Sequence, residues 1–273
     1  DPDQYKYLSK QTQKYVDELT NFELEKVIKS MTKVCKKDIK QSSILSGGID
    51  SSLVTSFVQN NYYKKMDIYT LLVKEKDNVS PHAIEMSKKI NKNDSLSHKQ
   101  INCEPEEYFK ALIHSISILS SPINTHSIPS SYLVAKKASE DGNDVLYGGE
   151  GADELFLGYN CYLNNESSDY NKIVDNFNSL DKLYASVSSS FINKYLIEQK
   201  NIFYDSPKIK SLSKEERHLL TESYLDYTIQ LPNVGLISTD TVNSDLGIEC
   251  RTPFTRIPLL KLGLSTPLNK KIN

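Results

Sequence analysis

The sequence has no tryptophan and, among its 273 residues, only three arginines, Arg217, Arg251 and Arg256. Nearly all of its basic charge therefore comes from lysine, and the net charge is −2. This balance gives no electrostatic reason to expect binding to nucleic acid or to an anionic membrane. No apolar run approaches the ~20 residues that a membrane-spanning helix needs. We therefore expect neither nucleic acid nor a membrane as a partner.

Cysteine is also scarce. The four cysteines are widely spaced and form no Cys-x-x-Cys pair: Cys35, Cys103, Cys161 and Cys250. Wide spacing argues against a zinc site and against a dense disulfide framework. We expect free thiols in a reducing compartment, which predicts a cytoplasmic protein. The first residues show no signal-peptide pattern, although the sequence starts at Asp1 rather than at methionine.

Short apolar segments alternate with helix-like segments in the first part of the chain. We predict strands at Ile44–Leu45, Ile68–Val73, Leu96–Ile101 and Val145–Tyr147. Helices are predicted over Leu8–Lys37, from Ser51, from Pro81, over Pro105–Leu119 and from Pro129 to near Gly142. This alternation predicts an α/β fold with a doubly wound, mostly parallel sheet. Ligands of such sheets bind at the carboxyl ends of the strands.

The pattern changes after Tyr159. Residues 164–178 are polar and predict a loop, and helices are predicted over Lys182–Leu196, Lys214–Gln230 and Leu236–Leu246. We expect these helices to form a C-terminal helical cap beside the sheet. The expected organisation is an N-terminal helical segment over residues 1–40, an α/β core over 41–160 and a mainly helical part over 161–273 that completes the same domain.

The first chemical motif is a glycine-rich turn within Ser43–Thr55, "SILSGGIDSSLVT". Gly47 and Gly48 remove side chains where a strand turns into a helix, so backbone N–H groups can face a ligand oxygen. Asp50 would repel a phosphate at this place unless a cation bridges the two. The turn therefore predicts a polyphosphate bound with Mg²⁺. The alternative is a tight strand-to-helix turn with a capping aspartate.

The second motif is "YGGEGADELFLGY" at Tyr147–Tyr159. It combines several acids and glycines with an apolar ending that is typical of a buried segment. If both turns lie at the same edge of the sheet, Asp153 can share the metal with Asp50. Glu150 would then be a free carboxylate suited to general-base or orienting work. The alternative is an acidic surface turn.

Together these stretches resemble the synthetase domain of the asparagine synthetase family. "SGGIDSS" is similar to the SGGxDS pyrophosphate loop of ATP pyrophosphatases, a loop that GMP and NAD synthetases share. "GEGADELFLGY" resembles the more specific GEGxDExFxGY signature of asparagine synthetase relatives. "DYTIQLP" at Asp226–Pro232 and "LGIECRTPF" at Leu246–Phe254 are similar to a third family motif. The resemblance covers about Phe22 to Leu268 and implies an adenine nucleotide alpha hydrolase-like fold.

The resemblance also implies a chemistry and a set of site residues. The family adenylates a carboxylate with ATP, releases pyrophosphate and passes the acyl group to ammonia or an amine. The residues that the resemblance assigns to pyrophosphate are Ser46, Gly47, Gly48, Ser51 and Ser52. Asp50 and Asp153 would bind Mg²⁺, and Ile44 and the Gly149 backbone would contact the nucleoside. Glu150 would be the catalytic residue beside the reacting carboxylate.

The implied function is an AMP-forming amide ligase, with aspartate as the default carboxylate and asparagine as the product. Two alternatives stay open: a lactam- or peptide-cyclising relative, and a non-catalytic or partner-dependent nucleotide-binding subunit. The sequence contains no glutaminase domain, and it ends at Asn273 before the segment that supplies the family's catalytic lysine. We therefore expect ammonia rather than glutamine as the nitrogen donor, unless a separate glutaminase subunit supplies it. Homo-oligomerisation is left open.

Overall fold

The computed structural model describes residues 2–34, 38–62, 64–73, 81–91, 94–119, 125, 127–163, 198, 203–205 and 209–271. They form two compact units, and each unit is built from segments that are distant in the sequence. Unit 1 comprises Asp1–Glu18, Gly151–Pro232 and Leu260–Asn273, and unit 2 comprises Leu19–Glu150 and Asn233–Leu259. The predicted helix over Lys182–Leu196 and the predicted loop over 164–178 lie outside the described residues.

Unit 2 is built on a five-stranded parallel sheet with the strand order β3-β2-β1-β4-β5. The strands are β1 (Gln41–Ile44), β2 (Met66–Val73), β3 (Leu96–Cys103), β4 (Val145–Tyr147) and β5 (Glu249–Arg251). The order reverses direction on either side of β1, as it does in doubly wound folds. The predicted α/β fold class is confirmed. Strand β5 was not predicted, because a three-residue strand with exposed Glu249 has no apolar run to reveal it.

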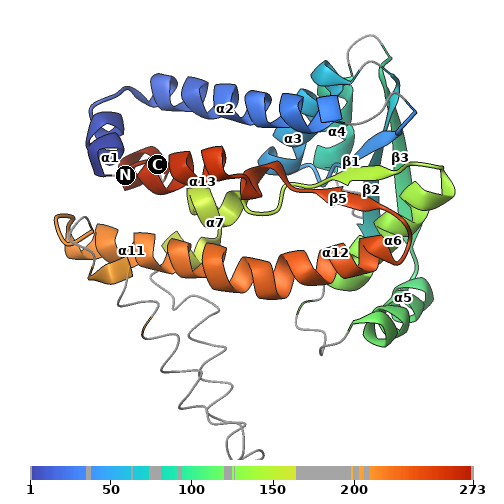
Figure 1. Cartoon of the computed structure of the whole chain (residues 1–273). Helices are drawn as coiled ribbons and strands as arrows, with labels where there is room; N and C mark the ends of the chain where they lie inside the picture. Colours follow the sequence, from blue (N-terminus) through green and yellow to red (C-terminus); the bar gives the residue numbers. More distant parts are fainter. Residues whose placement is uncertain are drawn as a thin grey trace, which may run out of the picture. The chain divides into compact units, whose positions relative to one another are not determined.

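Helices cover both faces of this sheet (Figure 1). Helices α3 (Ile49–Asn61) and α4 (Pro81–Ile90) pack together on one face, and α6 (Ser127–Glu140) and α12 (Ile237–Ser244) lie on the other. Helix α5 (Pro105–Ile118) packs on α6. Under α6 lies an apolar cluster of fully or almost fully buried side chains: Tyr69, Val134, Ala135, Ala138, Leu146 and Ile248. The burial of this cluster holds the two layers together.

Unit 1 is helical among its described residues. Its helices are α1 (Pro2–Ser9), α7 (Ala152–Phe156), α8 (Asn160–Leu163), α11 (Lys214–Leu225) and α14 (Leu268–Lys271). Helix α11 begins at a capping box, in which the Ser213 hydroxyl accepts a hydrogen bond from the Glu216 N–H at 3.2 Å. Helices α2 (Gln13–Val34) and α13 (Ile257–Ser265) have residues in both units.

One helix boundary corrects a prediction. The single helix predicted over Leu8–Lys37 is two helices, α1 and α2. The Thr12 hydroxyl accepts a hydrogen bond from the N–H of Tyr15 at 3.3 Å, and its carbonyl accepts one from Val16 at 3.2 Å. Thr12 therefore caps the start of α2. This local hydrogen bond divides the region that the apolar spacing predicted to be one continuous helix.

A second boundary concerns the helix predicted over Lys214–Gln230. Helix α11 ends at Leu225 and continues as a π-helix, η1 (Asp226–Leu236), which leads directly into α12. Pro232 lies inside η1 and has no N–H to donate. Wide helical turns of this kind are rare and are often found at functional sites.

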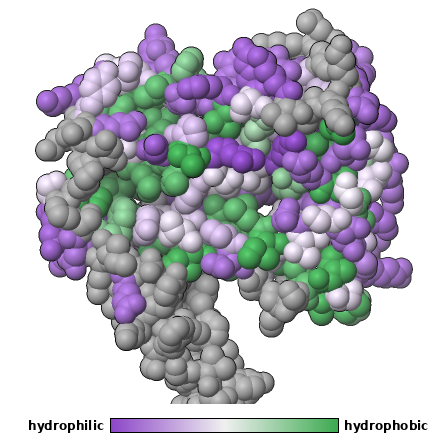
Figure 2. All heavy atoms as spheres, viewed as in Figure 1, coloured by the Kyte–Doolittle hydropathy of each residue, from purple (hydrophilic) through white to green (hydrophobic). Residues whose placement is uncertain are grey.

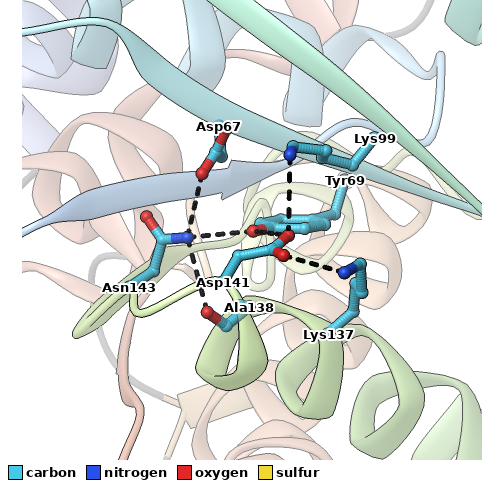
Figure 3. A network of polar contacts seen from close by, with 7 residues as sticks. All are labelled: Asp67, Tyr69, Lys99, Lys137, Ala138, Asp141 and Asn143. Atoms are coloured by element: carbon cyan, nitrogen blue, oxygen red, sulfur yellow. Dashed lines mark hydrogen bonds and ion pairs between the residues drawn. The ribbon is translucent and has the colours of Figure 1, made fainter.

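A polar network joins β2 and β3 to the turn between α6 and β4, near the amino ends of β2 and β4 (Figure 3). The Tyr69 hydroxyl donates to Asp141 Oδ2 at 2.9 Å and accepts from Asn143 Nδ2 at 2.9 Å. The same amide nitrogen contacts Asp67 Oδ2 at 3.2 Å. The Lys137 ammonium donates to Asp141 Oδ1 at 2.8 Å. The two buried members, Tyr69 and Asn143, thus both have hydrogen-bond partners, as buried polar groups require.

Apolar side chains also reach the surface of unit 2 on α5. Phe109, Ile113 and Ile116 are 60%, 52% and 51% exposed and follow a spacing of three and four residues. Green spheres gather over this helix at the lower right of Figure 2. Within the described part of the chain, no helix combines the length and the apolar character needed to cross a membrane.

Candidate functional site

The first glycine-rich turn leaves the carboxyl end of β1. The Leu45 N–H donates to the carbonyl of Tyr69 at 2.8 Å, and the Thr70 hydroxyl donates to the carbonyl of Leu45 at 2.6 Å. These bonds from β2 fix the exit of β1 just before the turn. Ile44, predicted to contact a nucleoside, is partly buried and packs against the apolar cluster of unit 2.

The two glycines of this turn are required for different reasons. Gly47 has a φ of +90°, and a Cβ at this position would lie 2.6 Å from the backbone nitrogen of Ala83 in α4. A side chain is therefore excluded by both conformation and space. Gly48 is the N-cap of α3 and provides no side-chain hydrogen bond to that helix end. The first turn of α3 is thus not capped by its own N-cap residue, which is the arrangement that lets a helix end receive an anion.

The serines of the turn bind to the turn itself. The Ser46 and Ser51 hydroxyls are 2.9 Å apart, and the Ser52 hydroxyl donates to the carbonyl of Gly48 at 2.6 Å. A hydroxyl carries a single proton, so Ser52 must release the Gly48 carbonyl before it can donate to a phosphate. The structure shows these serines bracing the loop, and their assignment to pyrophosphate stays a prediction.

The second glycine-rich turn lies against the first. Strand β4 pairs with β1, with Tyr147 opposite Ser43, so both turns leave the same edge of the sheet. A Cβ at Gly149 would lie 3.2 Å from the Cβ of Asp50 and 3.2 Å from the nitrogen of Ser51. Gly149 therefore lets the two turns approach within van der Waals contact. The structure thus places the Gly149 backbone against Asp50, and the assignment of either residue to a ligand stays a prediction.

Glu150 is the most unusual group at this edge. Its Oε2 atom is buried and has no hydrogen-bond partner among the described residues. The carboxylate folds back over Gly148, where any Cβ would overlap it. Burial raises the pKa of Glu150 above its usual range. A carboxylate that costs free energy to keep charged will take up a proton readily, which suits a general base.

Asp153, the second predicted metal ligand, belongs to unit 1 and lies on α7. Burial raises the pKa of Asp153. A Cβ at Gly158 would overlap its Oδ1 atom, which explains the glycine at that position. The described residues contain no group of three or more acidic, histidine or cysteine side chains that could hold a metal ion. Magnesium commonly uses one or two carboxylates together with phosphate oxygens, so a pair of aspartates fits it, and the pair stays a prediction.

The rest of the acidic motif is fixed inside unit 1. Glu154 is 6% exposed and accepts a hydrogen bond from the Tyr159 hydroxyl at 2.9 Å. Asp226 is 4% exposed and accepts one from the Tyr162 hydroxyl at 2.5 Å. Burial and the charge of Glu154 raise the pKa of Tyr227 to about 12. The motifs "DELFLGY" and "DYTIQLP" thus contribute to one buried cluster, a pairing that the sequence did not reveal.

A cavity of about 250 Å³ in unit 2 was also not predicted. It is lined by residues at the end of η1, in the first turn of α12, in β5 and just after β5: Leu236, Ile237, Thr239, Asp240, Cys250 and Thr252. Part of this set lies in the motif "LGIECRTPF", which marked the region without indicating a cavity.

The fold and the two turns define the class of this protein. It is a doubly wound α/β protein with its glycine-rich turns at the carboxyl ends of β1 and β4. The family model described as asparagine synthase matches residues 24–273. The chain belongs to the asparagine synthase family, as the motifs indicated.

Individual relatives were found as well. The chain is 29% identical over 127 residues to asparagine synthetase [glutamine-hydrolyzing] 1 of Bacillus subtilis (strain 168). The match covers 46% of this chain and 19% of that relative. A solved NMN synthetase from Francisella tularensis is 19% identical with a TM-score of 0.37, covering 51% of this chain and 58% of that chain. The NH3-dependent NAD synthetase from Campylobacter jejuni is 15% identical with a TM-score of 0.40, covering 81% and 94%.

Proposed function

We propose that this chain is an ATP-dependent, AMP-forming amide ligase. It adenylates a carboxylate, releases pyrophosphate and transfers the acyl group to ammonia or an amine, with aspartate as the default carboxylate and asparagine as the product. Membership of the asparagine synthase family supports a synthetase. The curated relative is named as a glutamine-hydrolysing asparagine synthetase, which supports an amino-acid substrate.

One observation carries the proposal: Glu150, whose buried Oε2 atom has no hydrogen-bond partner among the described residues, projects from a turn that touches the start of α3. Neither feature improves the stability of the protein on its own. A buried carboxylate oxygen without a hydrogen-bond donor costs free energy, and a glycine N-cap stabilises the helix start less than serine or aspartate would, by roughly a few tenths of a kcal/mol. Side by side, they provide an anion site and a base at the same edge of the sheet.

In the proposed reaction, the α3 N-terminus and the backbone of Gly48 receive the pyrophosphate end of ATP. Asp50 and Asp153 would hold Mg²⁺, and the metal would supply positive charge beside the leaving pyrophosphate. The Gly149 backbone and Ile44 would contact the nucleoside. Glu150 accepts a proton from the attacking nitrogen, and its raised pKa favours that transfer.

A pyrophosphate-release assay with a panel of carboxylates, each with ammonia and with primary amines, tests this function. We expect AMP and pyrophosphate in equal amounts for at least one carboxylate, and aspartate is the first to try. ATP binding without AMP formation for any carboxylate would instead support the partner-dependent nucleotide-binding subunit. An internal amide in the product would identify the lactam- or peptide-cyclising relative.

A further inference from the structure

The cavity at the end of β5 lies at the same edge of the sheet as the second glycine-rich turn. Cys250 pairs with Leu146 of β4, and the Gly148 N–H donates to the carbonyl of Arg251 at 3.0 Å. Strand β4 runs from this pairing directly into Gly148 and Glu150. The cavity and the proposed base therefore belong to neighbouring strand ends in unit 2.

The lining of the cavity has one formal charge. Asp240 contributes a carboxylate, and the other lining side chains are two apolar residues, two threonines and a cysteine. Neither lysine, arginine nor histidine is among these lining residues. A ligand that carries a negative charge would meet a carboxylate here and no cation, whereas a positively charged group would meet a matching partner.

The pKa of Cys250 indicates the electrostatic potential at the wall of the cavity. Burial raises the pKa of its thiol, and the carboxylates of Glu150, Asp240 and Glu249 raise it further. Glu249 is paired with Arg251, whose Nε donates to it at 2.9 Å. The thiol therefore stays protonated, so Cys250 lines the cavity as an uncharged side chain and does not act as a nucleophile. The sulfur of Cys250 is partly buried and lies in the field of nearby carboxylates, of which Asp240 itself lines the cavity, so the potential there favours a cation.

The volume of the cavity distinguishes between free ammonium and a larger organic ammonium ion as its ligand. Ammonium is about as large as a water molecule, whose share of liquid volume is about 30 Å³. A cavity of about 250 Å³ is several times larger than this, and Leu236 and Ile237 give part of its wall an apolar surface. The space fits a charged head with a short hydrocarbon chain attached.

We infer that the cavity binds a small primary amine as its ammonium ion, with the charged group at Asp240 and the hydrocarbon chain against Leu236 and Ile237. This amine would be the nucleophile of the ligase, so the inference rests on the proposed function. It narrows the nitrogen source from ammonia or an amine to a substituted amine.

The chemical step balances with the groups already named. The bound ammonium gives one proton to the carboxylate of Glu150 and becomes a neutral amine. Its lone pair attacks the acyl carbon of the adenylated carboxylate, a C–N bond forms, and the bond from that carbon to the phosphate oxygen breaks. AMP leaves with the electron pair, and the second nitrogen proton passes to solvent as the amide forms.

Protein-detected NMR titration of the nucleotide-free chain with n-butylammonium tests the binding site without turnover. Butyrate and 1-butanol, which are similar in size, serve as negative and neutral probes. We expect shifts at Asp240 and Cys250 with n-butylammonium and weaker binding of the other two probes. Because Asp240 is exposed, Asp240→Asn should weaken amine binding by about fivefold.

Two further variants complete the test. Thr239→Phe fills the cavity and should weaken all binding there, whereas Asp38→Asn removes an exposed charge before β1, at the opposite end of the sheet, and should change nothing. Equal or tighter binding of butyrate, no binding of the amine, or amine binding unaffected by Asp240→Asn and Thr239→Phe would overturn the inference. AMP formation with ammonia alone would remain possible in those cases, so failure of this inference is distinguishable from failure of the ligase proposal.

Discussion

The two ends of the sheet in unit 2 treat buried polar groups differently. Near the amino ends of β2 and β4, Tyr69, Asp141 and Asn143 satisfy one another's hydrogen bonds (Figure 3). Burial acts to raise the pKa of Asp141, but Lys137, Tyr69 and Lys99 together hold it below its usual range. At the carboxyl ends, the Oε2 atom of Glu150 is buried with no such partner among the described residues, and burial raises the pKa of this side chain.

This contrast separates groups that stabilise the fold from groups that are available for chemistry. A satisfied network specifies the packing of α6 on the sheet, because breaking any member leaves another buried group unpaired. An acid without a hydrogen-bond partner does not specify packing in this way, and its burial lowers the stability of the fold. We therefore expect mutations at the amino end to change stability with little effect on activity, and mutations at the carboxyl end to do the reverse.

The largest expected effect is on the rate, at Glu150. Glu150→Gln should keep the fold and ATP affinity but slow product formation by ~10²–10⁴-fold, the usual contribution of a general base. Single-turnover formation of AMP and amide, measured beside ATP affinity, checks this. Glu140→Gln, an exposed change on α6, is the matched control and should behave like the parent. Full turnover by Glu150→Gln would contradict the assignment of chemistry to the carboxyl end of the sheet.

The next effect is on nucleotide binding, at Asp50. Asp50→Asn should weaken Mg²⁺-dependent ATP binding by about tenfold or more, because a carboxylate in an anion site needs a cation between it and the phosphate. Calorimetry with and without Mg²⁺ measures this. In the absence of the metal, the variant should bind ATP no more weakly than the parent, since a repulsive charge has been removed. Equal affinities in Mg²⁺ would refute the metal assignment.

The amino end of the sheet should respond in stability alone. Tyr69→Phe removes the hydroxyl between Asp141 and Asn143 and should lower the free energy of unfolding by about 1–3 kcal/mol. Urea denaturation gives this value, and ATP affinity should not change. Tyr7→Phe is the control, because Tyr7 is 51% exposed and its loss should cost less than about 0.5 kcal/mol. A large loss of ATP affinity in Tyr69→Phe would contradict the division between the two ends.

The smallest effect is a dependence of stability on pH. Because burial raises the pKa of Glu150 in the folded state, the folded protein binds its proton more tightly than the unfolded chain does. The contribution of Glu150 to stability is thus fully present below about pH 4.3, its unfolded value, and is lost as pH rises through the folded pKa. Comparing the parent with Glu150→Gln by urea denaturation across this range isolates the contribution from that of Asp153. A parent and a variant with parallel pH profiles would show that Glu150 is solvated in solution.

Much of the α/β architecture could be predicted from the sequence. The apolar strands β2 and β4 and the helix signals at Pro81 and Pro105 are local, since they depend on side chains within a few residues of one another. Prediction from local sequence failed where a capping hydrogen bond or the pairing of one strand with another determined the structure. Thr12 divides a region of continuous helical spacing into α1 and α2, and β5 exists because β4 provides a partner for it.

By itself, the sequence determined the two glycine-rich turns, the identity of Asp50 and Glu150 as the acids beside them, and membership of the asparagine synthase family. Those features depend on residue type and spacing along the chain. The tertiary structure decided that Gly149 lies against Asp50, that the Oε2 atom of Glu150 has no hydrogen-bond partner among the described residues, and that α12 and β5 line a cavity with Asp240 in its wall. Each of these depends on which segments fold beside one another, because burial and the local electric field come from groups far away in the sequence.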